Sequence, residues 1–311
     1  MKDVLSDILD TVALKAALYF RTDYHTPFGV AVPAFERAAR FHLVVQGQCF
    51  VRLENGVIVP VLPGDLVLVP NGSPHVIASD RDTKCKPLAD IISETGFNGQ
   101  GPFVIGNGPA TESCQMVCGH FTFAQGADHP LLRAVPEILH ITAADRANLP
   151  MLDDVLRLIV RRMFADEPGA AATVSRLSEV LFIEVMRAGV AQVPDISRLM
   201  SAVYDPHIGQ ALALIHNDVA TPWTVDSLAT AVAMSRSRFA ERFRDLVGSG
   251  PMTYIAEWRM QRALDLLGRE HASVKMVASR VGYKSAAAFT RAFTERFGAS
   301  PRDHRQGDLG E

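Results

Sequence analysis

A repeat with a period of 50 residues constrains the fold of this chain more than any other feature. The first set of repeated residues is matched by a second set in the same order: Phe239, Phe243, Gly248 and Pro251, then Phe289, Phe293, Gly298 and Pro301. Four matches at one spacing indicate a duplicated structural unit. Phenylalanines four residues apart lie on one face of a helix, and Gly followed by Pro ends it. The C-terminal third is therefore expected to hold two copies of one helical unit.

Each copy reads as a short helix, a turn that contains a small residue, and a second helix. In the second copy, Gly282 suits a turn with a positive φ, and Ser285 is placed to cap the next helix. Ser235 has the same place in the first copy, and residues 252–267 read as a connecting helix. This order is typical of a helix-turn-helix, whose second helix enters the major groove of DNA. Two such helices on one rigid unit would reach successive grooves, roughly 34 Å apart.

Charge is divided unevenly along the chain. Residues 223–306 contain 14 Lys and Arg against 8 Asp and Glu, a net of +6, whereas the remainder contains 17 basic and 26 acidic residues, a net of −9. A basic segment in an acidic chain indicates that this segment faces a polyanion. The overall net charge of −3 argues against a protein that simply coats or bends nucleic acid. Double-stranded DNA, bound by one part of the chain, is the expected partner.

Two stretches carry a family resemblance: WTVDSLATAVAMSRSRFAERF and VASRVGYKSAAAFTRAFTERFGASP. Over about residues 207–306 they resemble the DNA-binding domain of the AraC/XylS family of transcription regulators. The resemblance implies that the second helix of each copy contacts DNA: arginines on phosphates or a guanine edge, alanines close to thymine methyl groups. Glu241 would read a cytosine amino group or orient a neighbouring Arg. The predicted DNA-binding residues are Arg236, Ser237, Arg238, Ala240, Glu241, Arg244, Lys284, Ser285, Ala286, Ala287 and Arg291.

The N-terminal half is expected to be β-structure. From Ala38 onward, short apolar runs alternate with Gly, Pro and Asn, and Asn55-Gly56 predicts a hairpin turn. The spacing Gly64-x5-Pro70-x-Gly72-x2-His75 resembles the second motif of the cupin superfamily, with Ser in place of the usual terminal Asn. Together with CGHFTF and HPLLRAVPEIL, it resembles the sensor domain of one branch of the AraC family. The resemblance implies a cupin-like β-barrel with an enclosed pocket.

Four residues are the candidates for an effector pocket: His42, His75, Cys118 and His120. Cys118 and His120 alternate on a strand and so share a face, and with His42 or His75 they would suit zinc or another divalent metal. The alternative is that they are separate core residues around an apolar pocket. The first cupin motif is incomplete, because that region supplies only His42. This counts against the alternative function, a cupin-type metalloenzyme with an accessory helical domain, and the chain is expected not to be an enzyme.

Cys85, Cys114 and Cys118 are candidates for a redox switch. On a regular strand, Cys114 and Cys118 would lie about 13 Å apart, too far for a mutual disulfide, so Cys85 would pair with one of them. An organic effector in the mouth of the barrel is the leading alternative. A phosphate-bearing effector is a further one, for which the available arginines are Arg37, Arg40, Arg157 and Arg161.

These features together predict an α+β chain with a cupin-like sensor domain at 1–145, a helical dimerisation and linker segment at 146–200, and a tandem helix-turn-helix domain at 201–306. Helical patterns occupy roughly 150–165 and 173–190, and 190–200 reads as a linker. Three aspartates interrupt the N-terminal segment, which argues against a secretory signal, and no apolar run is long enough for a membrane span. The expectation is a cytoplasmic, one-component transcription regulator, a homodimer that senses a small ligand, metal or oxidant and contacts RNA polymerase.

Overall fold

The computed structural model describes residues 3–35, 38–109, 112–124, 126–163, 167–269 and 272–307. Contacts divide the chain into two compact units that alternate along the sequence. The sheet unit comprises residues 15–123 and 135–192, and the helical unit comprises 1–14, 124–134 and 193–311. The helical unit thus includes two short segments from the N-terminal half of the chain, 1–14 and 124–134. The sequence suggested consecutive domains instead. The boundaries 1–145, 146–200 and 201–306 stay a prediction.

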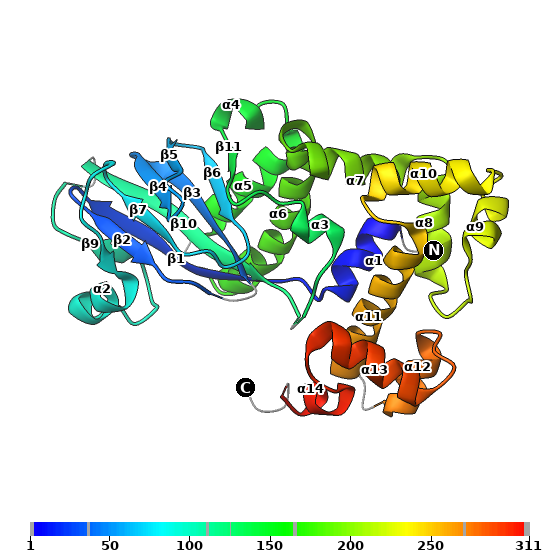
Figure 1. Ribbon diagram of the computed structural model, residues 1–311. Helices are drawn as coiled ribbons and strands as arrows, with labels where there is room; N and C mark the ends of the chain where they lie inside the picture. The colour runs from blue at the N-terminus through cyan, green and yellow to red at the C-terminus, as the bar shows by residue number, and fades with distance from the viewer. Residues whose placement is uncertain are drawn as a thin grey trace. The chain divides into compact units, whose positions relative to one another are not determined.

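Two β-sheets form the centre of the sheet unit (Figure 1). The first has the strand order β11-β6-β3-β10-β1-β9 and the second the order β5-β4-β7-β2-β8. The strands of the first are β1 (Lys15–His25), β3 (Ala38–Gln46), β6 (Leu66–Val69), β9 (Phe103–Ile105), β10 (Ser113–Thr122) and β11 (Leu139–Ile141). Those of the second are β2 (Gly29–Val32), β4 (Cys49–Leu53), β5 (Ile58–Val61), β7 (His75–Ala78) and β8 (Lys86–Pro87).

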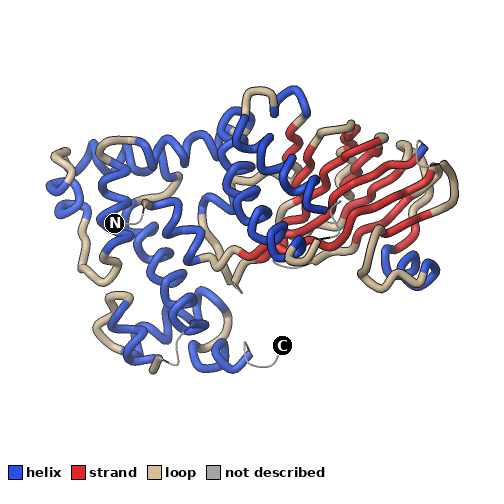
Figure 2. The backbone as a smooth tube through the Cα atoms, turned by 180° about the vertical axis from the view of Figure 1, so that it is seen from behind, coloured by secondary structure: helices blue, strands red, loops and turns tan. Residues whose placement is uncertain are grey.

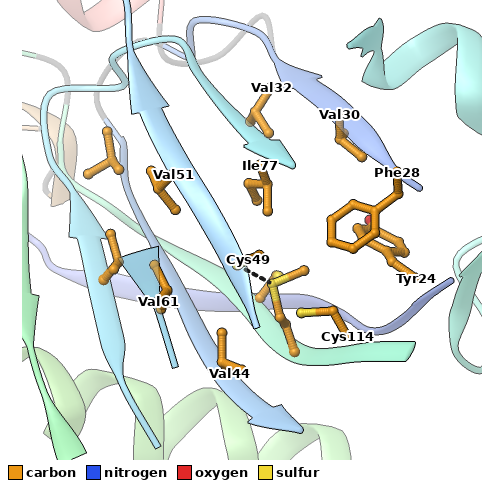
Figure 3. Close-up of a cluster of buried hydrophobic side chains, with 14 of the residues drawn as sticks. Tyr24, Phe28, Val30, Val32, Val44, Cys49, Val51, Val61, Ile77 and Cys114 are labelled. Carbon is orange, nitrogen blue, oxygen red and sulfur yellow. Dashed lines mark hydrogen bonds between the residues drawn. The ribbon is translucent and has the colours of Figure 1, made fainter. Parts of the chain in front are cut away.

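A buried apolar cluster joins the two sheets face to face (Figure 3). Val44 and Cys114 come from the first sheet, and Val30, Val51 and Ile77 come from the second. Alternate side chains of each strand enter this cluster, as the period of two in a strand requires. The predicted hairpin at Asn55-Gly56 is confirmed, since β4 and β5 pair on either side of it.

The expected β-structure is confirmed, but the expected closed barrel is not. Over the described residues, the edge strands β5 and β8 of one sheet form no ladder with the edge strands β9 and β11 of the other. Strand alternation in the sequence predicts inward and outward faces equally well for a barrel and for two facing sheets, so it does not distinguish them.

Helices cover the outer face of the first sheet (Figure 2). Phe182 of α6 packs on Phe121 of β10 with ring centroids 5.1 Å apart, and Ser175 of the same helix donates a hydrogen bond to the Ala16 carbonyl at 2.7 Å. The helices predicted near 150–165 and 173–190 are confirmed as α5 and α6. The helices of this unit are α2 (Leu88–Thr95), α4 (Ala143–Arg146), α5 (Pro150–Met163) and α6 (Ala170–Gln192).

The helical unit contains the repeat. Its helices are α1 (Val4–Thr11), α3 (Pro130–Arg133), α7 (Pro194–Tyr204), α8 (Ile208–Asn217), α9 (Val225–Ala231), α10 (Arg236–Val247), α11 (Pro251–Arg269), α12 (Val274–Arg280), α13 (Ala286–Phe297) and α14 (Pro301–Gly307). The expectation that 190–200 is a linker is wrong, because α7 begins at Pro194 and buries Ile196 and Met200. Proline suits the first position of a helix, where its missing N–H is not needed. None of the described helices is long and apolar enough to cross a membrane.

Each copy of the repeat has its own apolar core. Phe239 and Phe243 of α10 lie in one cluster, and Phe289 and Phe293 of α13 lie in another, all with 0% of their surface exposed. The turn between the paired helices begins with a residue at positive φ in both copies, Ala233 at 54° and Gly282 at 81°. This confirms the duplicated short helix, turn and second helix.

Candidate DNA-binding surface and sensor interior

The first recognition helix, α10, exposes the residues that the sequence predicted to contact DNA. Arg236, Ser237, Arg238, Glu241 and Arg244 are exposed, and Ala240 is half-buried. Phe239 and Phe243 face the opposite way, into the core, because residues four apart share one side of a helix. Helix α10 can therefore present its polar side to a ligand while its phenylalanines anchor it in the apolar core.

The second recognition helix, α13, has the same arrangement with a smoother surface. Lys284, Ser285, Ala287 and Arg291 are exposed, and Ala286 is half-buried. Ser285 accepts a hydrogen bond from the Ala288 amide at 3.2 Å, which caps the helix as predicted. Ser235 occupies the N-cap position of α10 but accepts no such bond from its side chain. Small residues at the start of α13 allow a close approach of its backbone to a flat surface.

Several cations on this surface are free to meet phosphate groups. Within the described part of the chain, Arg238, Arg244, Lys284 and Arg291 have no ion-pair partner. Arg236 is different, because it pairs with Asp226 of α9 at 2.9 Å, although both side chains are exposed. An exposed pair of this kind contributes little and can exchange for another partner.

Two other arginines of the recognition helices have structural partners. Arg242 of α10 pairs with Asp205, whose carboxylate also accepts a hydrogen bond from the Ile208 amide at 2.8 Å. Arg296 of α13 pairs with Asp128 in the segment before α3. Sequence reasoning did not identify either pair, since Asp205 and Asp128 lie 37 and 168 residues from their partners.

A buried chain of hydrogen bonds crosses the helical unit behind the recognition helices. The Leu131 amide donates to Nδ1 of His129 at 3.1 Å, so Nε2–H of His129 donates to the Tyr254 hydroxyl at 3.3 Å. The Tyr254 hydroxyl then donates to Nε2 of His216 at 2.7 Å, and Nδ1–H of His216 donates to Asp7 at 2.9 Å. Burial lowers the pKa of both histidines, so each is neutral and these tautomers leave no partner unsatisfied.

This chain joins both short N-terminal segments to α11, the helix between the two copies. Asp7 lies in α1, His129 lies next to α3, and Tyr254 lies in α11. The segment 124–134 makes two further links to α11. Gln261 accepts a hydrogen bond from the Asp128 amide at 3.0 Å, and Arg133 pairs with Glu257 at 3.3 Å.

Three of the four predicted effector-pocket residues meet in the interior of the sheet unit. His42 of β3 lies beside Cys118 of β10, with Nδ1 and Sγ 3.2 Å apart, and its Nε2 lies 2.8 Å from Nε2 of His75. His75 belongs to β7 in the other sheet, so this contact connects the two sheets. His120 lies on the same face of β10 as Cys118, but its ring packs edge-on against Phe35 at 5.5 Å.

The direction of these hydrogen bonds follows from the Ser73 carbonyl, which can only accept. Nδ1–H of His75 donates to it at 3.0 Å, so Nε2 of His75 accepts from Nε2–H of His42. Nδ1 of His42 is then the acceptor for the Cys118 thiol. Burial lowers the pKa of His75 to about 4 and that of His42 well below its usual value, which keeps both neutral.

The arrangement of the His and Cys side chains bears on the predicted metal site. In the part of the chain that the structure describes, no group of three or more His, Cys, Asp or Glu residues is arranged to hold a metal ion. His42 uses both ring nitrogens for bonds to His75 and Cys118. As placed, these donors bond to one another and do not fit a zinc site, and the zinc prediction gains no support.

The redox candidates occupy two different environments. Cys114 and Cys118 are buried in the interior, whereas Cys85 is half-buried and accepts a hydrogen bond from Arg52 at 3.1 Å. Burial raises the pKa of the Cys118 thiol. The pKa of the Cys49 thiol is also raised, first by a hydrogen bond with Cys114 and second by burial. The sequence did not single out Cys49, which points into the same interior from the opposite sheet (Figure 3). A raised pKa makes a thiol less reactive at neutral pH.

Comparisons with known proteins agree with this arrangement. A cupin family model matches residues 3–191, more than half of the chain, and a helix-turn-helix domain model matches residues 228–307. The HTH-type transcriptional regulator AlkR of Acinetobacter baylyi is 31% identical over 98% of this chain and 99% of its own. The RCS-specific HTH-type transcriptional activator RclR of Escherichia coli is 25% identical over 92% of this chain and 89% of its own.

Among solved structures, the DNA-binding domain of AdpA in complex with a target DNA is 33% identical, with a TM-score of 0.32. That match covers 33% of this chain and 92% of the other. The sequence resemblance to the AraC/XylS family is confirmed, and the relatives are named as regulators, which points to a regulator rather than to a metalloenzyme. With a cupin-like N-terminal region and a C-terminal tandem helix-turn-helix, the chain belongs to the AraC-type transcription regulators.

Proposed function

We propose that α10 and α13 occupy two successive major grooves on one face of promoter DNA. The observation that carries this proposal is the pairing of buried phenylalanines with exposed polar residues on both helices. Arg238, Arg244 and Lys284 would contact phosphates and set the position of the protein. Arg291 would read a guanine, and Ala286 and Ala287 would lie against base edges.

A fluorescence anisotropy experiment tests this assignment of roles. DNA is first selected from a random pool by the full chain, and affinities are measured for the selected site and for single-base variants. We expect Arg291→Ala to weaken binding to the preferred site by about 1–3 kcal/mol and to relax the preference at one base pair. Arg176→Ala, which removes an exposed arginine of α6 in the sheet unit, is the matched control and should leave the affinity within about twofold. A uniform loss over all sequences would instead make Arg291 a phosphate contact.

The signal is proposed to act in the sheet unit through the hydrogen-bonded residues His42, His75 and Cys118. A small ligand or an oxidant that displaces one of them would shift β3 and β10 relative to β7. Strand β10 continues directly into the segment 124–134, and α1 continues directly into β1, which pairs with β10 along its length. The two segments that hold α11 and α13 are therefore extensions of one strand pair, and a regulator needs such a link between signal and DNA-binding states.

Hydrogen exchange tests this route without knowledge of the effector. We expect His42→Ala to raise amide exchange in β3 and β10, in the segment 124–134, and in α13. Val61→Ala shortens a fully buried side chain of β5, an edge strand, and serves as the control, with raised exchange confined to the sheet unit. If both variants leave exchange in α13 unchanged, or alter it equally, the proposed route is wrong.

The assembly and surroundings of the protein are also proposals. A homodimer would place two tandem helix-turn-helix units on one promoter, which suits a regulator that binds repeated sites. RNA polymerase bound at the same promoter would be the protein partner, and the cytoplasm would be the compartment. Analytical ultracentrifugation at micromolar concentration would detect the dimer, and a single species with the mass of one chain would contradict it.

A further inference from the structure

A cavity of about 370 Å³ lies within the sheet unit, between strand β3 and helix α5. This volume is in the range of pockets for small ligands, about 300–1,000 Å³. Its lining residues are Leu43, Val44, Val45, Gly64, Arg146, Leu156, Arg157, Val160 and Arg161. Of these lining residues, only Val44 also belongs to the apolar cluster that contains Cys118.

Three of the lining residues are arginines, and one carboxylate stands beside them. Arg146 and Arg157 both pair with Asp153, the latter at 2.5 Å. Arg161 has no ion-pair partner among the residues that the structure describes. Three positive charges against one negative charge leave the pocket with an excess of two positive charges, so it favours an anion. Of the other arginines that the sequence offered for a phosphate, Arg40 lies elsewhere, bonded to the Pro33 carbonyl, and Arg37 lies outside the described residues.

Arg146 is held in the pocket wall with one donor unused. Its side chain is 12% exposed, and Nη1 donates to the Gly64 carbonyl at 2.5 Å while Nη2 contacts Asp153. Nε of the same guanidinium is buried and has no hydrogen-bond partner. Gly64 permits this position, because a Cβ there would meet Ala143 of α4 at 3.0 Å. Because Nε is buried, a ligand in the pocket would meet Nη1 and Nη2 of this guanidinium rather than Nε.

The rest of the lining is apolar. Leu43 of β3 and Leu156 of α5 are buried, and Val160 is half-buried one turn after Leu156. A ligand that fits both parts has an anionic head and an apolar body. We propose that this pocket binds a small organic anion whose carboxylate or phosphate head pairs with Arg146, Arg157 and Arg161, and whose apolar body lies against Leu43, Leu156 and Val160. Its role as an effector site rests on the proposed function, whereas binding itself does not.

Isothermal titration calorimetry on the full chain tests the binding. Octanoate and octyl phosphate are the probes, and octanol is the neutral control of similar shape. We expect at least one of the two anions to bind and octanol to bind at least about tenfold more weakly, because a hydrogen-bonded charge pair is worth roughly that factor or more. Binding of one anion alone identifies the head group. Equal binding of octanol, or no binding of either anion at millimolar concentration, overturns the proposal.

Matched variants locate the site. Arg161→Gln removes a free cation of the pocket and is expected to weaken anion binding at least about fivefold. Arg162→Gln removes the neighbouring cation, which pairs with Glu167 and does not line the pocket, and should leave the affinity within about twofold. Arg146 is not chosen, because its loss would also release Asp153 and the Gly64 carbonyl. Equal effects of the two variants would mean that the anion binds by general charge, which contradicts this site.

The effector role has a separate readout. The DNA affinity of the wild-type chain is expected to change at least about threefold with saturating anion, and that of Arg161→Gln is expected to stay constant at the same anion concentration. If the anion binds through Arg161 and the DNA affinity does not change, the site stands and its effector role is wrong. If the chain binds no DNA under any condition, the proposed function fails while the binding site is unaffected.

Discussion

The two helix-turn-helix copies share their phenylalanine anchors but differ in what supports them. The first copy packs on the N-terminal helix, since Val4 and Ile8 of α1 belong to its apolar cluster. The second copy packs beside the segment that follows β10, since Ala124 lies against its cluster and Asp128 contacts Arg296 of α13. A duplicated sequence therefore does not have a duplicated environment. Within the helical unit, the first copy therefore contacts the segment that precedes β1, and the second copy contacts the segment that follows β10.

Removal of one phenylalanine from each copy should give the largest effects and show how independent the copies are. Phe243→Ala and Phe293→Ala each remove a fully buried ring and are expected to cost about 3–5 kcal/mol. The ring of Phe243 also packs on Tyr254 of α11, at 5.7 Å between centroids, so its loss should disturb the connecting helix. Urea unfolding gives the totals, and hydrogen exchange gives the region. Equal exchange increases in both copies for both variants would contradict separate cores.

Tyr254 distinguishes the first copy, because the second has no such buried chain of hydrogen bonds among its described residues. Tyr254→Phe leaves Nε2 of His129 and Nε2 of His216 without partners and should cost about 1–3 kcal/mol. Tyr283→Phe, which alters a half-buried tyrosine of the second copy, is the control and should cost under about 1 kcal/mol. Comparable losses in urea unfolding would mean that the chain contributes nothing specific to the first copy.

The pairing of Asp205 with Arg242 predicts a pH dependence for the first copy. Burial acts to raise the pKa of the Asp205 carboxyl, but hydrogen bonds from Arg242 and the Ile208 and His207 amides outweigh it, so the pKa is lowered. A carboxyl with a lowered folded-state pKa stabilises the fold above its unfolded pKa of about 3.9, and this contribution is lost as the pH falls through the folded pKa. The stability gap between wild type and Asp205→Asn should thus be largest at neutral pH and shrink below about pH 4. A gap that widens on acidification would contradict the assignment.

The two N-cap serines give the smallest and most closely matched comparison. Ser285→Ala removes a cap bond to the Ala288 amide and should cost about 1 kcal/mol. Ser235→Ala removes a side chain that makes no cap bond and should change the unfolding free energy by a few tenths of a kcal/mol at most. Both serines are exposed, so a difference in burial does not contribute to the difference between the two unfolding free energies. Equal costs in thermal unfolding would show that the two caps are alike in solution.

Local patterns in the sequence predicted much of this fold. The spacing of phenylalanine, glycine and proline located both helix-turn-helix copies, because helix faces and helix ends depend on neighbouring residues. The spacing from Gly64 to His75 likewise located the β-structure that brings His42, His75 and Cys118 together. Strand alternation did not decide between a barrel and two facing sheets, and Pro194 was read as part of a linker although it begins α7.

Contacts between residues far apart in the sequence could not be predicted. No local signal links Asp7 to His216 or Asp128 to Arg296. The sequence therefore did not predict that the segments 1–14 and 124–134 belong to the helical unit. The same holds for Arg146, which joins Arg157 and Arg161 only because α4 folds over the turn at Gly64. A single sequence gives the residues of such sites but not their grouping.

Methylation interference on the selected DNA tests most directly whether both copies read DNA. Methylation of guanine N7 blocks contacts in the major groove, so each recognition helix should produce one cluster of interfering positions. We predict two clusters about 10–10.5 base pairs apart on one face of the duplex, with Arg291→Ala erasing the cluster under α13 and leaving the one under α10. A single cluster in the wild type, or two clusters that persist unchanged in Arg291→Ala, would contradict the account.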